Sequence, residues 1–237
     1  MRTVSRFRSI STILFVSIFV ISAFAAPKDK PKFGDKWEGE IAAFDKLNQS
    51  EKYPDNSILF TGSSSIRIWS TIKEELSPYP IIQRGFGGSN SPAVAYYTER
   101  IVYPHQFSAV AIFIGNDITG SPDDLTPKES TATFRKIIKT IRAKYKKQPI
   151  FIIEITPCQS RWKKWAAIQE NNAGLKALCK KQKNLYFIET AQSFLNEKGE
   201  PRNELFRDDH LHLNRDGYKI WGKLIKAELD KRLKVKG

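Results

Sequence analysis

The chain has 237 residues, of which 41% are hydrophobic and 27% are charged, and it contains two cysteines. This composition provides a sizeable apolar core, so it excludes a disordered or fibrous chain, and two cysteines are too few for a disulfide scaffold or a thiolate zinc site. The length fits one domain, and the net charge of +14 raises the question of nucleic-acid binding.

The N-terminus has the three-part pattern of a secretory signal peptide. Three arginines within residues 1–8 precede a mainly apolar run over 10–24, and the small-x-small sequence AFA ends at residue 25. An uncleaved N-terminal anchor is the alternative, but the run is short for a membrane span. We therefore expect residues 1–25 to be a signal peptide and the protein to be secreted or periplasmic. Its removal lowers the net charge from +14 to +11.

After a polar linker at residues 26–36, apolar residues alternate between helical and strand spacing. In chain order, the spacing predicts a helix from 37 to 44, a strand at 57–61, a weaker strand at 80–83, a strand at 109–114, a helix over 134–145, a strand at 150–153, a helix over 168–179, a strand at 186–188 and a final helix over 218–233. Strands that alternate with helices are typical of βαβ units. We therefore predict one three-layer α/β domain with a parallel sheet.

Unusual polar residues follow the first strand, where such sheets build their sites. The sequence there is GSSSIR at 62–67. Serines at a strand-to-helix junction commonly cap the helix by accepting hydrogen bonds from its first N–H groups. The alternative is that one hydroxyl is a nucleophile activated by a nearby base.

Two further segments follow the second and third strands. GFGGSN at 85–90 either turns the chain or brings backbone N–H groups close to a ligand, and a dinucleotide-binding fingerprint fails because Asn90 occupies the last glycine position. Gly115-Asn116-Asp117 is either a turn closed by its side chains or a place where the Asn116 amide donates to an oxyanion.

The strongest local signal is DDHLHLN at 208–214, which holds two of the three histidines. It is either a solvated polar turn or, if 209–212 form a helical turn, a place where Asp209 and His212 share one face and form a carboxylate–imidazole pair. A zinc site is a weaker rival, because no HExxH spacing is present and His105 lies far away in the sequence. The nucleophile elbow G-x-S-x-G is absent.

Taken together, these segments resemble the SGNH (GDSL-type) esterase/lipase superfamily. Its four blocks correspond to residues 60–65, 85–89, 115–117 and 209–214. The GSSSIR sequence and the segment after the fourth strand, from Glu154-Ile155-Thr156-Pro157 through Arg161-Trp162, are similar to those of bacterial secreted members. The resemblance implies a flavodoxin-like parallel sheet between helices over residues 37–237. It also implies a serine esterase that needs no metal or organic cofactor.

The resemblance also implies which residues form the site. It places a catalytic triad on Ser64, Asp209 and His212. It places an oxyanion hole on the Ser64 and Gly88 N–H groups and the Asn116 amide. The choice of Ser64 follows from its third position in the Gly-Asp-Ser block.

Two positions depart from the superfamily pattern. Ser63 replaces the acid of the Gly-Asp-Ser block, which is not the triad acid, so the implied mechanism is unaffected. The third block usually reads Gly-x-Asn-Asp, whereas here Gly115 stands directly before the asparagine. This shift affects the expected geometry of the loop that carries the oxyanion donor.

For function, we expect hydrolysis of carboxylic esters through an acyl-enzyme, with small acyl groups such as acetyl removed from a carbohydrate or a lipid. Trp162 and Trp165 follow the fourth strand among basic neighbours, so they either form a substrate rim or cap the core. A lysophospholipase or lipase is one alternative. A non-catalytic carbohydrate-binding protein of the cell envelope with the same fold is another.

The positive charge and the cysteines have less specific interpretations. We expect the charge to reflect solubility and loose association with anionic envelope surfaces, and we expect no nucleic-acid partner. The basic final helix is the feature with which nucleic-acid binding would be tested. Cys158 and Cys179 could pair in an oxidising compartment, but only if their Cα atoms lie close enough.

Overall fold

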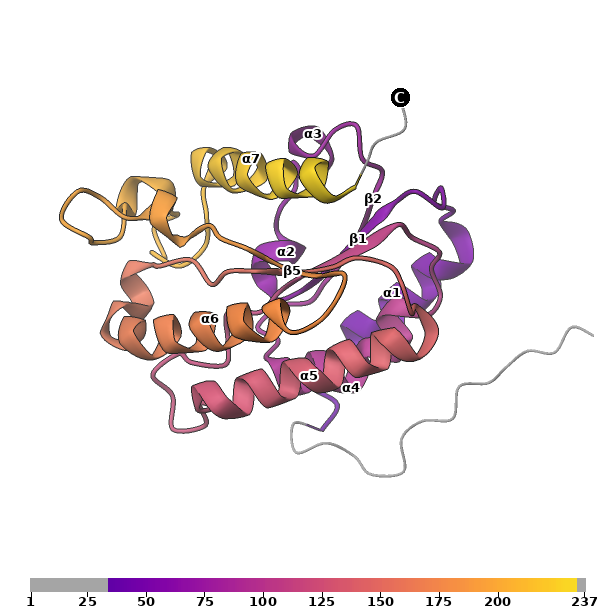
Figure 1. The fold of residues 1–237 in the computed structure, drawn as a ribbon, viewed down its shortest axis with the longest axis horizontal. Coiled ribbons are helices and arrows are strands. Elements are labelled where there is room, and N and C mark those ends of the chain that lie inside the picture. The colour runs from indigo at the N-terminus through magenta and orange to yellow at the C-terminus, as the bar shows by residue number, and fades with distance from the viewer. Residues whose placement is uncertain (1–33, 234–237) are drawn as a thin grey trace, which may run out of the picture. The chain divides into compact units, whose positions relative to one another are not determined.

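The computed structural model describes residues 34–233, which form a five-stranded parallel sheet between two layers of helices (Figure 1). The strands, in the order β2-β1-β3-β4-β5 across the sheet, are β1 (Ile58–Gly62), β2 (Ile81–Gly85), β3 (Ala109–Phe113), β4 (Ile150–Ile153) and β5 (Leu185–Ile188). The predicted three-layer α/β fold is confirmed. The expected signal peptide at 1–25 and most of the expected linker at 26–36 lie outside the described residues.

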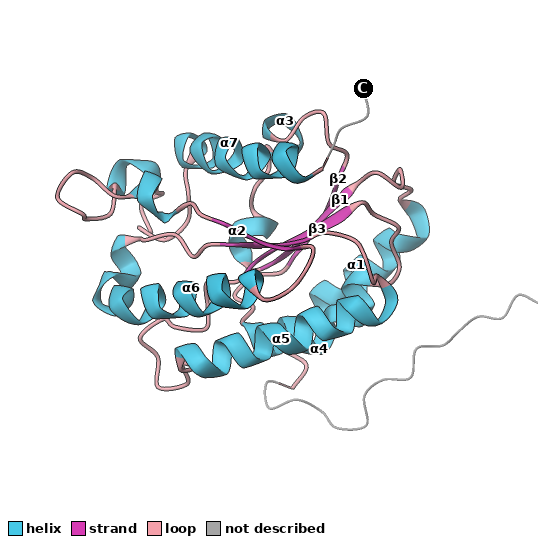
Figure 2. Ribbon diagram, viewed as in Figure 1, coloured by secondary structure: helices cyan, strands magenta, loops and turns pink. Residues whose placement is uncertain are grey.

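Helices cover both faces of this sheet (Figure 2). They are α1 (Glu38–Ser50), α2 (Ser64–Arg67), α3 (Ile72–Glu75), α4 (Ser91–Val102), α5 (Pro127–Lys144), α6 (Trp165–Lys180) and α7 (Arg215–Arg232), with short 3-10 helices η1 (Gln159–Lys164), η2 (Ala191–Phe194) and η3 (Asn203–Leu205). In Figure 1, α7 lies on one side of the sheet, and α4, α5 and α6 lie on the other. Among residues 34–233 we find no helix long and apolar enough to cross a membrane.

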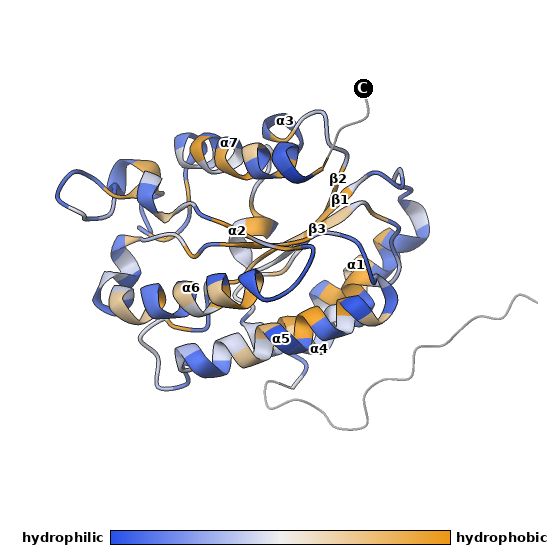
Figure 3. Ribbon diagram, viewed as in Figure 1, coloured by the Kyte–Doolittle hydropathy of each residue, from blue (hydrophilic) through white to orange (hydrophobic). Residues whose placement is uncertain are grey.

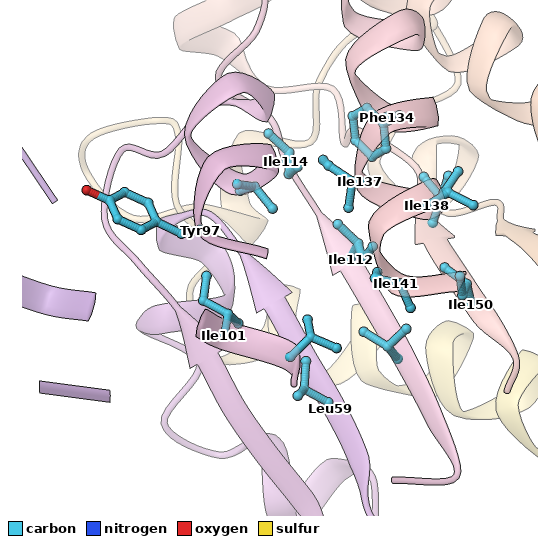
Figure 4. Close-up of a cluster of buried hydrophobic side chains, with 14 of the residues drawn as sticks. Leu59, Tyr97, Ile101, Ile112, Ile114, Phe134, Ile137, Ile138, Ile141 and Ile150 are labelled. Carbon is cyan, nitrogen blue, oxygen red and sulfur yellow. The ribbon is translucent and has the colours of Figure 1, made fainter. Parts of the chain in front are cut away.

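The central strands are continuously apolar because both of their faces are covered. Every residue of β1 and β3 is buried. Successive side chains alternate between the two layers, so Leu59 packs towards α4 and α5 while Phe60 packs towards α7. Figure 4 shows the first of these cores, where Leu59 of β1 lies near Ile101 of α4 and Ile112 of β3 lies near Ile137 and Ile141 of α5. In Figure 3 the hydrophobic colour is concentrated in the strands and on parts of the helices.

The register of the sheet brings the ends of three strands to one level. Gly62 at the end of β1 pairs with Gly85 of β2 on one side and with Phe113 of β3 on the other. Since the chain leaves β1 first for β2 and later for β3, the strand order reverses between β1 and β3. Parallel sheets bind ligands at the carboxyl edge beside such a reversal. The loops that follow β1 and β3 therefore meet where a site is expected.

The cysteines lie in different layers of the fold. Cys158 packs in the core under α7, and Cys179 packs in the core on the opposite face of the sheet. Both are buried and free. The β-sheet lies between the two thiols. The disulfide considered from the sequence is therefore not formed in this fold.

Candidate active site

A serine, a histidine and an aspartate form a chain of hydrogen bonds at the carboxyl edge of the sheet. Ser64 Oγ lies 2.8 Å from His212 Nε2, and His212 Nδ1 lies 2.6 Å from Asp209 Oδ2. Ser64 and His212 are 148 positions apart in the sequence. The structure thus brings together the three residues that the sequence predicts for the triad.

The end of β1 determines where Ser64 lies. Gly62 has a φ of +124°, and a Cβ at this position would collide with the carbonyl oxygen of Phe113, so only glycine fits between the two strands. The next residue, Ser63, donates its N–H to that same oxygen at 2.9 Å and precedes α2 without capping it through its side chain. Capping therefore does not explain the serine at the N-cap position. Ser64 is the first residue of the short helix α2.

A small turn before α7 carries the histidine and the aspartate. Phe206 and Leu213 form an isolated antiparallel bridge, and the residues between them form a turn rather than the helical turn considered from the sequence. Asp209 Oδ1 accepts the N–H groups of Leu211 and His212, each at 2.9 Å. These bonds hold one carboxylate oxygen, so the other faces the imidazole ring.

The carboxylate of Asp209 is ionised at neutral and mildly acidic pH. Partial burial by itself raises its pKa, but the hydrogen bonds from the His212 ring and from the backbone N–H groups outweigh burial and lower the pKa of Asp209 to about 2. An ionised carboxylate only accepts hydrogen bonds, so Nδ1 of the neutral imidazole carries the proton. The other ring nitrogen, Nε2, is then free to accept the proton of the Ser64 hydroxyl.

Asn116 lies beside this chain of hydrogen bonds, and both ends of its side-chain amide form hydrogen bonds. Its Nδ2 donates to the carbonyl oxygen of Ser89 at 2.9 Å, and its Oδ1 accepts from Nη2 of Arg161 at 2.5 Å. Asp117, the next residue, is buried and accepts from the Ser91 N–H at 2.7 Å. The loop after β3 is thus fixed to the start of α4. One of the two amide N–H bonds of Asn116 has no acceptor among the described residues.

The loop after β2 carries Gly88 and is held by α1. Trp37 Nε1 donates to the Gly87 carbonyl oxygen at 2.7 Å, and the Gly87 N–H donates to Glu40 Oε2 at 3.1 Å. The backbone N–H and C=O of Gly87 therefore both form hydrogen bonds with residues at the start of the domain. Gly88 follows with a φ of +65° and is exposed. It does not line the pocket at Ser64, although its neighbour Ser89 contacts Asn116.

A narrow pocket opens at Ser64, with a volume of about 30 Å³. It is lined by polar groups of the site and by an apolar wall, including Ser64, Asn116, Arg161, His212, Phe113, Ile155 and Leu211. Such a volume holds one or two water molecules. The enclosed space beside the serine is therefore small.

The two tryptophans do not line this pocket, and Trp165 packs against a small apolar cluster of Ile118, Ile155 and Ile168, as expected of a residue that caps the core. Their rings stack on each other, with centroids 5.9 Å apart and planes inclined by 19°. Trp165 lines a separate groove of about 360 Å³ between α6 and the end of β5, together with polar residues that include Gln169 and Gln192. Neither ring is buried.

A family model corresponds to most of this chain. The GDSL-like lipase/acylhydrolase family matches residues 57–220, which include the serine, asparagine, aspartate and histidine just described. The chain belongs to this family. It is therefore a carboxylic ester hydrolase, as the resemblance implied. Comparison with curated proteins gives no match.

Solved structures agree with the fold of this GDSL-like hydrolase. A Streptococcus pneumonia protein whose description names platelet activating factor superposes with a TM-score of 0.71 at 21% identity, over 82% of this chain and 93% of its own. A GDSL-like lipase from Bacteroides thetaiotaomicron gives 0.69 at 19% identity, over 81% and 98%. A carbohydrate esterase family 3 structure from Talaromyces cellulolyticus gives 0.60 at 15% identity, over 76% and 98%. At these identities the likeness shows the fold alone.

Sequence reasoning missed two features of this hydrolase. Arg161 was expected only as part of the loop at 159–165 at the rim of the site, and nothing in the sequence indicates its contact with Asn116. The contacts of Trp37 and Glu40 with the glycine loop were also missed, because no local pattern links positions 47 or 50 residues apart.

Among residues 34–233, no group of three or more His, Cys, Asp or Glu side chains could hold a metal ion.

Proposed function

We propose that this hydrolase cleaves esters of small acyl groups through an acyl-enzyme on Ser64, with His212 as general base and acid and Asp209 as the residue that orients it. The hydrogen-bonded chain from Ser64 Oγ to Nε2 at 2.8 Å and from Nδ1 to Asp209 at 2.6 Å carries this proposal. A hydroxyl is a weak nucleophile unless a base removes its proton, and here the base lies within hydrogen-bond distance.

The reaction follows from these contacts. Ser64 Oγ attacks the ester carbonyl carbon while Nε2 of His212 takes the hydroxyl proton. The tetrahedral intermediate collapses when the same proton passes to the leaving alcohol. Water, deprotonated by His212, then attacks the acyl-enzyme carbonyl carbon. The second tetrahedral intermediate releases the acid as His212 returns the proton to Ser64 Oγ. Asp209 stabilises the imidazolium that forms in each half of the reaction.

The oxyanion needs donors on the side of the carbonyl away from the histidine. We assign the Asn116 amide N–H, the Ser64 N–H and the Gly88 N–H to this role. The first residue of a helix has no intrahelical acceptor for its N–H, so the Ser64 N–H is available. Gly88 lies outside the pocket lining, so its participation requires substrate to extend towards the loop after β2. Losing one donor of this kind typically costs ~10²–10³ in kcat.

For the substrate, we propose an acetyl or similarly short acyl group on a carbohydrate outside the cytoplasm. The pocket of about 30 Å³ supports a short acyl group. The half-buried Trp165 and the amide side chains of the groove beside it are groups that commonly bind sugar rings. The likeness to a carbohydrate esterase agrees with this choice. A lipid ester is the second candidate, since the family description includes lipases.

The nucleophile is tested by three alanine variants assayed on p-nitrophenyl acetate. Ser64→Ala should abolish turnover and covalent labelling by a fluorophosphonate probe while leaving the thermal transition nearly unchanged. Ser63→Ala and Ser65→Ala are the neighbouring comparisons. If either of these abolishes labelling and Ser64→Ala does not, the assignment of the nucleophile is wrong. A wild-type protein that never reacts with the probe would instead favour a non-catalytic binding protein.

The acyl preference is tested by a series of p-nitrophenyl esters from acetate to decanoate. We expect kcat/KM to be highest for acetate, because the pocket beside Ser64 has no room for a long chain. A maximum at octanoate or decanoate would contradict the small-acyl proposal and favour a lipase. Acetylated and deacetylated oligosaccharides then test the carbohydrate part, with acetate release as the measurement.

A further inference from the structure

Arg161 reaches into the active site from the segment after β4. It lies in η1 (Gln159–Lys164), and its side chain is half-buried while those of Lys163 and Lys164 are exposed. Its Nη1 donates to the Gly115 carbonyl oxygen and its Nη2 donates to Asn116 Oδ1. The same guanidinium lines the pocket at Ser64. One arginine thus holds two successive residues of the loop after β3.

These bonds fix which way the Asn116 amide faces. A guanidinium only donates hydrogen bonds, so it can face only the Oδ1 end of the amide. The Ser89 carbonyl oxygen only accepts, so it can face only the Nδ2 end. The two contacts therefore agree on a single orientation, and they leave one Nδ2–H bond for another acceptor.

The contact with Gly115 explains the shifted glycine of the third block. A Cβ at position 115 would lie 3.3 Å from Nη1 of Arg161, which is a tight contact. The guanidinium therefore packs against the backbone where a side chain would crowd it. The arginine and the glycine that departs from the family pattern form one arrangement.

Arg161 has no carboxylate among its hydrogen-bond partners, although the negative charge of Asp124 acts on the guanidinium and by itself raises its pKa. Both of its acceptors are neutral oxygens, and within the described part of the chain it forms no ion pair. Burial lowers the pKa of this guanidinium, but an arginine stays protonated in proteins. A partly buried positive charge is costly unless something offsets it. The negative charge that develops on a bound ester lies in the same pocket.

We propose that Arg161 is a positioning residue for the reaction: it holds the Asn116 amide ready to donate to the oxyanion, and its charge strengthens that donor. A cation that donates to Oδ1 polarises the amide and makes its N–H groups better donors. A donor that is already oriented does not have to reorganise when charge develops. This inference rests on the proposed function, in which Asn116 is an oxyanion donor.

The test compares Arg161→Gln, Arg161→Lys and Lys163→Gln on p-nitrophenyl acetate. Lys163 lies in the same turn and lines neither pocket, so Lys163→Gln is the matched control for loss of one positive charge. We expect Arg161→Gln to lower kcat by about tenfold or more, which is less than the loss of a whole donor, with KM within about twofold. Arg161→Lys should recover part of the loss, because it keeps the charge without the planar fork. Lys163→Gln should behave as wild type.

A double variant separates positioning from a structural role. If Arg161 acts through Asn116, Arg161→Gln should add little to the loss caused by Asn116→Ala. Multiplied losses in the double variant would overturn the inference. An increase in KM with unchanged kcat would also overturn it, because Arg161 would then bind substrate directly. Thermal transitions of all variants check that the fold is intact, and Arg161→Lys serves if Arg161→Gln is unstable.

The outcomes distinguish the two proposals. If Ser64→Ala remains active, or if Asn116→Ala has normal kcat, the proposed mechanism fails and the role of Arg161 fails with it. If both of those variants are impaired while Arg161→Gln matches wild type, the esterase mechanism stands and only the inference on Arg161 is overturned.

Discussion

Acid should destabilise this fold through one buried histidine. His105 is 6% exposed, and within residues 34–233 its Nε2 has no hydrogen-bond partner. Burial, assisted by the positive charge of Arg84, lowers the pKa of His105 from 6.5 to about 4. Between these two values the unfolded chain binds a proton that the folded chain excludes. Stability is therefore greatest above pH 6.5 and decreases as the pH falls towards 4.

The size of this effect follows from the two pKa values. For a pKa of 6.5 unfolded and about 4 folded, the free energy of unfolding falls by about 2 kcal/mol between pH 7 and pH 5. The variant His105→Phe keeps an aromatic ring against Tyr53, whose centroid lies 6.0 Å away, and removes the titrating group.

Urea denaturation at a series of pH values measures this difference. The wild-type protein should lose about 2 kcal/mol more than His105→Phe over that interval. His210→Asn, at an exposed position with a φ of +52°, is the control for removing a histidine. Parallel stability curves for wild type and His105→Phe would refute the reasoning, because the buried ring would then contribute nothing to the pH dependence.

Three other substitutions test the frame of the site. Gly62→Ala should give little folded protein by circular dichroism, because its Cβ would collide with the Phe113 carbonyl oxygen; a normal thermal transition would contradict this. Trp37→Phe should lower the unfolding free energy by about 1–2 kcal/mol by removing the hydrogen bond to Gly87, and should reduce kcat more than it changes KM. Asp209→Asn should reduce kcat at least about 100-fold on p-nitrophenyl acetate, and a loss below tenfold would argue against its orienting role.

Strands β1, β3 and β4 were predictable because all of their residues are buried. A run such as 109–114 has no polar residue to interrupt it, and the structure places β3 at Ala109–Phe113 with every residue buried. Helix α4 was not predicted, although the sequence contains its start signal. Asn90 caps it by accepting from the Ala93 N–H, and Pro92 lies in its first turn. Because these residues directly follow the glycine-rich segment, they were interpreted as part of a loop and the helix was missed.

The candidate site was predictable where its chemistry is local and obscure where it depends on tertiary contacts. Asp209 and His212 are three positions apart, so their pairing could be inferred from the sequence. Arg161 is one of three cations in four residues, and only the folded path of η1 shows which of them turns inward. The resemblance extends through Arg161 in the segment after the fourth strand, but it assigns no role to this residue, because Arg161 lies outside the four blocks.

The first helix also has a practical consequence for anyone who shortens this protein. The family match begins at residue 57, after α1 has ended at Ser50. A fragment cut to 57–220 would keep Ser64, Asp209 and His212, yet it would lose both partners of the Gly87 backbone and most of α7. We therefore expect that an active fragment must begin no later than Trp37, twenty residues before the start of the family match.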